Sequence, residues 1–222
     1  MSSEQIYTGL LQFAVLLFSL VFHEFSHAWT AMRNGDPTAK ELGRVTLNPV
    51  AHADPVGTVL FPLMQIFTGV PLIGWAKPVP VNSNRLRHPR RDDILVSMAG
   101  PGSNLLLAFV AALLWRANSS LLGSYESGFL FTLHEFMQAV LPLLLQINVL
   151  LALFNLIPMP PLDGSWVLYR LLPPRLAEPY RRFGRQWGFI VVLALVFTGV
   201  ARQFIGFGFS LVAPFLRAIA GI

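Results

Sequence analysis

The residues best suited to chemistry lie close together near the N-terminus, where positions 23 to 29 read HEFSHAW. His23 and His27 are four residues apart, so on a helix both imidazoles project from the same face and can bind one metal ion. Glu24 follows the first histidine directly. In sites with this H-E-x-x-H spacing, the glutamate takes a proton from metal-bound water and delivers it to the leaving amine. The pattern predicts a metal-dependent hydrolytic site with Glu24 as its general base.

A third ligand is expected, because a catalytic zinc ion usually takes three protein ligands and leaves its fourth position to water. Asp163 is the best candidate. Three prolines shortly before it end a hydrophobic helix and let the chain turn Asp163 back toward the histidines. His134 and Glu135 lie at the opposite end of that helix and are excluded, and His88 lies in an arginine-rich loop where it is expected to be solvated.

The elements that hold these residues are apolar enough to lie in a membrane. Of the 222 residues, 54% are hydrophobic and only 12% are charged, whereas a soluble domain carries about 25% charge. We therefore expect a polytopic membrane protein. The absence of cysteine excludes thiolate catalysis, iron–sulfur clusters and cysteine zinc sites. The net charge of +5 is typical of basic cytoplasmic loops, so nucleic-acid binding is not expected.

Several apolar segments have the length of a membrane helix. Residues 5–29, 94–115 and 136–157 are each expected to span the bilayer. Residues 55–76 are uncharged but interrupted by prolines and glycines, which favours a broken or re-entrant segment. Residues 186–221 contain two apolar runs, which form either a helical hairpin or one span and an interfacial helix.

The distribution of basic residues predicts the orientation. Most of the 16 basic residues lie in three loops, at 33–44, 77–91 and 170–185, and none lies at 117–130. The positive-inside rule places the three basic loops in the cytoplasm and the N-terminus outside, and no cleavable signal peptide is recognised. For this topology to close, residues 55–76 must return to the side from which they entered, or part of 33–54 must dip into the membrane.

Together these motifs resemble those of the site-2 protease family, whose members are intramembrane zinc metalloproteases. The matching pieces are HEFSHAW at 23–29, residues 48–58 with the pattern NP…H.DP.GT, GWAKPVPVN at 74–82, AGPGSN at 99–104, and NLIPMPPLDG at 155–164. The resemblance covers about residues 10–170. It points to the compact bacterial and archaeal branch, in which we expect neither a PDZ insertion nor a CBS module.

The resemblance implies roles for the polar residues. His23, His27 and Asp163 would bind one zinc ion per chain, and Glu24 would be the general base. Asn155, in the same motif as Asp163, would contact the backbone of the substrate.

The resemblance also implies a small sheet. Residues 43–48 alternate in the manner of a short strand, and residues 74–82 contain alternating prolines that favour extended backbone. They would form a membrane-associated β-hairpin whose edge takes an unwound substrate as an added strand. The expected fold is all-α, with about five to six transmembrane helices in one domain, residues 1–222. Its catalytic core covers about residues 5–170, and C-terminal membrane helices follow at about 186–221.

Three further polar residues are left with open roles. His52 could hydrogen-bond a ligand, gate the substrate, act as an auxiliary ligand or cap a turn. Asn104 and Asn148 lie on apolar helices and are expected to form interhelical hydrogen bonds. Asn104 is also a candidate, beside His52, for contact with a metal ligand or with substrate.

The function expected from these observations is hydrolysis of peptide bonds in or near the transmembrane segments of single-span membrane proteins. The active site would face the cytoplasmic side of the cell membrane. A transporter or metal-handling protein would explain ionisable groups at membrane depth equally well, but it does not need Glu24 beside the ligands. A catalytically inactive adaptor is a third interpretation, and the intact H-E-x-x-H motif argues against it. The sequence does not indicate an oligomeric state.

Overall fold

Four long helices form most of the molecule in the computed structural model, which describes residues 2–68 and 74–221. They are α1 (Ser3–Arg33), α5 (Pro89–Leu122), α6 (Gly128–Asn155) and α9 (Val200–Ala220). Each is long and apolar enough to cross a membrane. The expected spans at 5–29, 94–115 and 136–157 are thus helical and lie largely within the first three of these helices.

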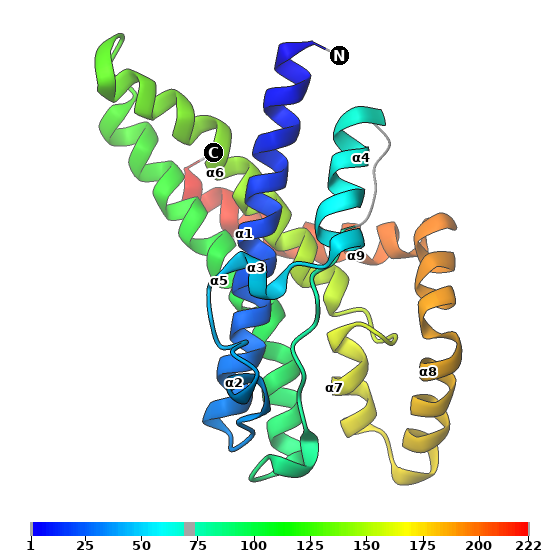
Figure 1. Cartoon of the computed structure of the whole chain (residues 1–222). Helices are drawn as coiled ribbons and strands as arrows, with labels where there is room; N and C mark the ends of the chain where they lie inside the picture. The colour runs from blue at the N-terminus through cyan, green and yellow to red at the C-terminus, as the bar shows by residue number, and fades with distance from the viewer. Residues whose placement is uncertain (1, 69–73, 222) are drawn as a thin grey trace.

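Small residues allow these helices to approach one another. Helices α5 and α6 form an antiparallel hairpin, against which α1 packs from one side and α9 crosses from another (Figure 1). The largest buried cluster joins α5, α6 and α9, and it consists of Ala108, Ala112, Val149, Leu153, Leu216 and Ala220. Close helix contact through small side chains is the usual mode of association in a membrane, where burying apolar surface gives little gain.

The connection from α1 to α5 is irregular and turns back on itself. It contains α2 (Thr38–Glu41), α3 (Pro49–His52), a π-helix (Pro55–Leu60), α4 (Phe61–Thr68) and a short 3-10 helix (Ser83–Arg85). The Trp75 N–H donates to the Gly57 carbonyl at 3.2 Å, and the Lys77 N–H donates to the His52 carbonyl at 2.9 Å.

The segment expected at 55–76 therefore ends beside its own start, which is one of the two ways in which the expected topology could close. Residues 69–73 of this segment lie outside the described residues. We call residues 55–82, in their described parts, the return segment. Figure 1 shows it rising through α4 and coming back toward α1 and α5.

The expected β-hairpin is absent from the described residues, since neither 43–48 nor 74–82 forms a strand. The physical reason is visible in the return segment, where side-chain carboxylates take the backbone N–H groups that a neighbouring strand would have used. These bonds run from the Val79 N–H to Glu24 Oε2 at 2.8 Å and from the Asn82 N–H to Asp36 Oδ2 at 2.6 Å.

Of the two arrangements expected for the C-terminal part, the structure has the one with a single candidate span, α9. After the short helix α7 (Asp163–Leu171) comes α8 (Pro174–Phe197), whose uncharged residues 186–197 reach only about 18 Å. A hydrocarbon core is about 30 Å thick, and α8 is not among the candidate spans. The described residues thus provide four candidate spans rather than five or six. Figure 1 shows α8 standing apart from the bundle of α1, α5 and α6.

Candidate metal centre

The three expected metal ligands converge in the structure. His23 Nε2 lies 3.1 Å from Asp163 Oδ2, and His27 Nε2 lies 3.3 Å from Asp163 Oδ1. The two Nε2 atoms are 3.0 Å apart. All three groups offer a ligand atom within 4.8 Å of the others. Both histidines are buried, while the side chain of Asp163 keeps 20% of its exposure and so remains reachable from one side.

A row of hydrogen bonds across three helices fixes the orientation of His23. The bonds, in order, are Ser19 Oγ to the Val15 carbonyl at 2.8 Å, Asn148 Nδ2 to Ser19 Oγ at 2.8 Å, Asn104 Nδ2 to Asn148 Oδ1 at 2.7 Å, and His23 Nδ1 to Asn104 Oδ1 at 2.6 Å. A backbone carbonyl can only accept, which sets the direction of each bond in turn. We call Ser19, Asn148, Asn104 and His23 the helix network. In the neutral ring, this leaves Nε2 of His23 as the acceptor.

His27 is fixed in the same way by backbone. Its Nδ1 lies 2.7 Å from the Val96 carbonyl on α5, so Nδ1 carries the proton and Nε2 presents a lone pair. With both rings neutral, two imidazole lone pairs and the Asp163 carboxylate face one another. Three such acceptors repel one another unless a proton or a metal ion lies between them. Two imidazoles and a carboxylate are a typical ligand set of catalytic zinc, so these residues fit a zinc ion.

Asp163 is the first residue of α7, and the far end of α7 is fastened to α5. Arg170 Nε donates to Asp93 Oδ2 at 2.7 Å, and Asp93 is buried. The cation that this ligand set fits would keep the Asp163 carboxylate ionised, as a metal ligand must be.

Gly100 explains how α5 can approach the imidazoles so closely. A Cβ atom added there would lie 2.5 Å from His23 Nε2 and closer still to His27 Nε2. Only a residue without a side chain fits at this position. The nearby Gly102 has open space around it, so the constraint belongs to Gly100 alone.

Glu24 lies on the same turn of α1 as the histidines but is not part of the ligand group. Its carboxylate is buried and accepts the hydrogen bond from the Val79 N–H described above. One oxygen of the expected general base is thus held by the backbone of the return segment.

The other predicted site residues lie outside the ligand group. Asn155 donates to the Leu151 carbonyl on its own helix at 2.9 Å. His52 is almost fully buried, its Nε2 lies 2.8 Å from the Thr46 carbonyl, and its Nδ1 has no partner in the described part of the chain. Of the roles left open for His52, the contacts present are those of a residue that orders a loop.

Sequence reasoning missed several residues that support the ligands. Ser19 could have been found, since it lies one helical turn before His23 on an otherwise apolar face. Asn148 was expected only to form an interhelical hydrogen bond. Its place in the helix network means that it also helps to orient Asn104, the acceptor of His23. The sequence contains no signal for the Val96 carbonyl, because every residue has a backbone carbonyl and its use as an acceptor does not depend on residue type. It contains none for the Asp93–Arg170 pair, because the two residues are far apart in the chain.

Comparison with known proteins gives a consistent result. The model of peptidase family M50 matches residues 120–199, a range that includes Asp163. "Putative zinc metalloprotease YwhC" of Bacillus subtilis is 40% identical over 187 residues, covering 82% of this chain and 78% of the relative. "Putative zinc metalloprotease Rip2" of Mycolicibacterium smegmatis is 31% identical over 221 residues, covering 96% of this chain and 78% of the relative. No solved structure matches the chain.

Proposed function

The chain belongs to peptidase family M50, and from this premise we propose that it is a multi-pass membrane zinc metalloprotease that hydrolyses peptide bonds in or near the transmembrane segments of other membrane proteins. One zinc ion would be held by His23, His27 and Asp163, with Glu24 as the general base. The active site would lie toward the cytoplasmic side of the cell membrane, where the basic loops collect.

The observation that carries the proposal is the convergence of three acceptors with fixed orientation. Both Nε2 lone pairs point at the Asp163 carboxylate, and each Nδ1 is held by an acceptor that cannot reverse. A group arranged in this way is costly at membrane depth unless a cation offsets it. The names of the relatives YwhC and Rip2 support zinc as that cation.

The chain's own residues divide the chemistry among them. When bound, zinc supplies Lewis-acid chemistry, lowering the pKa of a water molecule toward about 7 and polarising the scissile carbonyl. Glu24 accepts the proton of the attacking water and returns it to the leaving amine. Asn104 holds His23 in the ligating tautomer, and Asn155, at the end of α6, would bind the substrate backbone.

The substrate must be unwound before it is cut, because the peptide bonds of a membrane helix are shielded and already hydrogen-bonded. The return segment lies beside the catalytic base through Val79 and is held mostly by single hydrogen bonds to other elements. We assign to it the admission of substrate and water. A disulfide between cysteines placed in α4 and in the part of α1 that it contacts should block cleavage reversibly. Unchanged turnover in the crosslinked protein would rule this role out.

The central experiment compares wild type with Glu24→Gln. The amide oxygen can still accept from the Val79 N–H, so the local structure should persist while the base is lost. We expect about one zinc per chain in both proteins by elemental analysis, and a loss of about 10²- to 10⁴-fold in cleavage of single-span membrane proteins by the variant. Zinc binding with equal cleavage in both would remove Glu24 as the base. No stoichiometric metal after zinc loading of wild type would overturn the site.

A further inference from the structure

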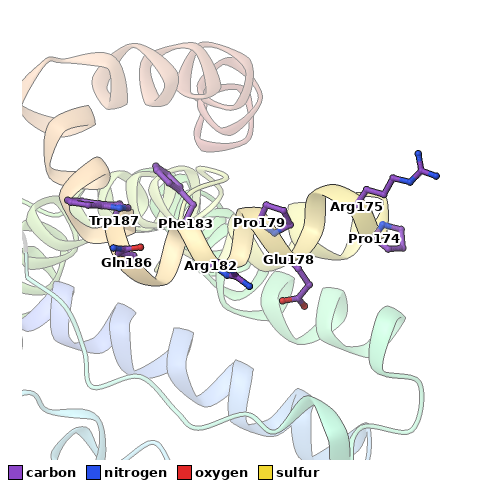
Figure 2. A pocket seen from close by; sticks show the side chains of 8 residues that line it. All are labelled: Pro174, Arg175, Glu178, Pro179, Arg182, Phe183, Gln186 and Trp187. Atoms are coloured by element: carbon purple, nitrogen blue, oxygen red, sulfur yellow. The ribbon is translucent and has the colours of Figure 1, made fainter.

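The first half of α8 presents an open groove that the metal centre does not use. Figure 2 shows its side chains in two rows, with Trp187, Phe183 and Pro179 along one edge and Gln186, Arg182 and Glu178 along the other. The rows follow the i, i+4 spacing of a helix surface, and the groove between them has a volume of about 590 Å³. Phe183 and Trp187 are both nearly half exposed, at 46% and 47%.

The groove carries net positive charge. Arg175 and Arg182 form no ion pair and no hydrogen bond within the described residues. The one carboxylate of the groove, Glu178, is already engaged by Arg181 at 3.2 Å and by the Tyr169 hydroxyl at 3.0 Å. Two guanidinium groups without a partner in the described residues therefore line the same groove as the exposed aromatic rings. Arg182 is next to Phe183, and Arg175 lies about two helical turns before it (Figure 2).

The position of this groove along α8 matches the boundary of a bilayer. Charged residues end at Arg185, and residues 186–197 that follow are uncharged. Trp187, directly after this change, is of the type that collects at the membrane–water interface. The basic start of α8 also lies at the same end of the molecule as α2, in the basic loop after α1 (Figure 1).

We propose that the α8 groove binds the headgroup of an anionic phospholipid, with Arg175 and Arg182 contacting its phosphate and Phe183 and Trp187 packing against its glycerol and upper acyl region. Arginine suits phosphate because its planar fork donates two parallel hydrogen bonds. The anionic lipids of a cytoplasmic leaflet supply the matching charge. A second copy of the chain fits less well, since a two-fold contact would place the same arginines against each other.

The test uses the lack of cysteine in the chain. A nitroxide label on Gln186→Cys reports on the groove, and the same label on the exposed Asn84→Cys serves as the control. Detergent-solubilised protein is titrated with short-chain phosphatidylglycerol and, separately, with short-chain phosphatidylcholine. We expect saturable immobilisation of the label at 186 by phosphatidylglycerol only, and no change at 84.

Native mass spectrometry of the unlabelled protein then counts bound phosphatidylglycerol, because a label can itself obstruct the groove. The double variant Arg175→Gln/Arg182→Gln should bind phosphatidylglycerol about 25-fold more weakly, since each basic residue near an anionic surface contributes about fivefold. Arg202→Gln, which removes an exposed arginine elsewhere, should bind it like wild type.

Three results would overturn the proposal. Equal binding of the two lipids would show that charge plays no part. An equal response of the label to inorganic phosphate alone would indicate a simple anion site. Affinity of the unlabelled protein for phosphatidylglycerol that is unchanged in the double variant, with folding confirmed by circular dichroism, would place the lipid elsewhere.

Discussion

The helix network and the return segment approach the same site but are held in opposite ways. In the network, fully buried side chains from α1, α5 and α6 bond to one another, and their hydrogen-bonding directions are fixed. The return segment reaches the site through one backbone N–H, that of Val79, and its helical part exposes apolar side chains such as Val59 and Phe67. We infer that the network serves metal binding and the return segment serves substrate. Substitutions in the network should therefore alter zinc binding, and substitutions in the return segment should alter cleavage without altering zinc binding.

The largest effect is expected for Gly100→Ala, on the network side. The new Cβ would displace both imidazoles, so zinc affinity should fall more than about 100-fold and cleavage should disappear with it. Elemental analysis and competition with a zinc chelator measure this. Gly102→Ala is the matched control, because its Cβ would meet open space, and it should behave like wild type. Full zinc occupancy in Gly100→Ala would contradict the geometry of the site.

Removing the hydrogen-bond acceptor of His23 should lower zinc affinity by a smaller factor. Asn104→Ala frees the ring to rotate and to exchange tautomers, and zinc affinity should fall about 10- to 100-fold. The spectrum of the cobalt-substituted protein should change as well, because the geometry of one ligand is no longer fixed. Asn118→Ala removes another buried asparagine from α5, far from the metal, and should leave the cobalt spectrum unaltered. Equal spectra in both variants would refute the role of the network.

On the other side of the comparison, Gly57→Ala should impair cleavage alone. Its Cβ would lie within 2.5 Å of the Trp75 indole and would push apart the two ends of the return segment. We expect about a 10- to 100-fold loss of cleavage with zinc content unchanged, since small displacements of substrate-positioning groups are costly. Gly206→Ala, in open space on α9, controls for the substitution itself. Loss of zinc from Gly57→Ala would show that the two regions are not separate.

The smallest effect is expected just beyond the return segment, in the short 3-10 helix (Ser83–Arg85) that follows it. Arg85 pairs with Glu41 at 2.8 Å, but both side chains are about half exposed, so solvent screens the pair. Arg85→Gln should change cleavage less than about twofold and leave zinc binding intact. A large loss of cleavage would mean that this pair, and not the buried contacts, holds the return segment in place.

The same comparison explains how much of the structure the sequence could predict. The metal ligands could be predicted from the sequence. The spacing of His23 and His27 places them on one helix face, and the order of the helices brings Asp163 to the same end. The long helices could be predicted from the length of their apolar segments. These features depend on local periodicity and on chain order, which a single sequence contains.

The return segment was predicted only in part. Its return was one of two arrangements that the charges of the loops allowed. Its strand did not form, because Glu24 takes the N–H of Val79. Glu24 is so far from Val79 in the chain that the local pattern of residue types, from which a strand is predicted, contains no sign of this contact. Gly100 lies within the AGPGSN piece, but the sequence does not indicate that its neighbours are the two imidazoles.

The direction of the hydrogen bonds in the helix network has a consequence for the membrane itself. The row of polar groups leads from the metal centre along α1 as far as the Val15 carbonyl, and a row of this kind could carry protons away from the site if it conducted them. It cannot do so, because each asparagine accepts with its oxygen and donates with its nitrogen, and a proton cannot pass from one atom to the other. The two amides thus block proton transfer along this row. In the proposed mechanism, protons would therefore enter and leave on the Glu24 side.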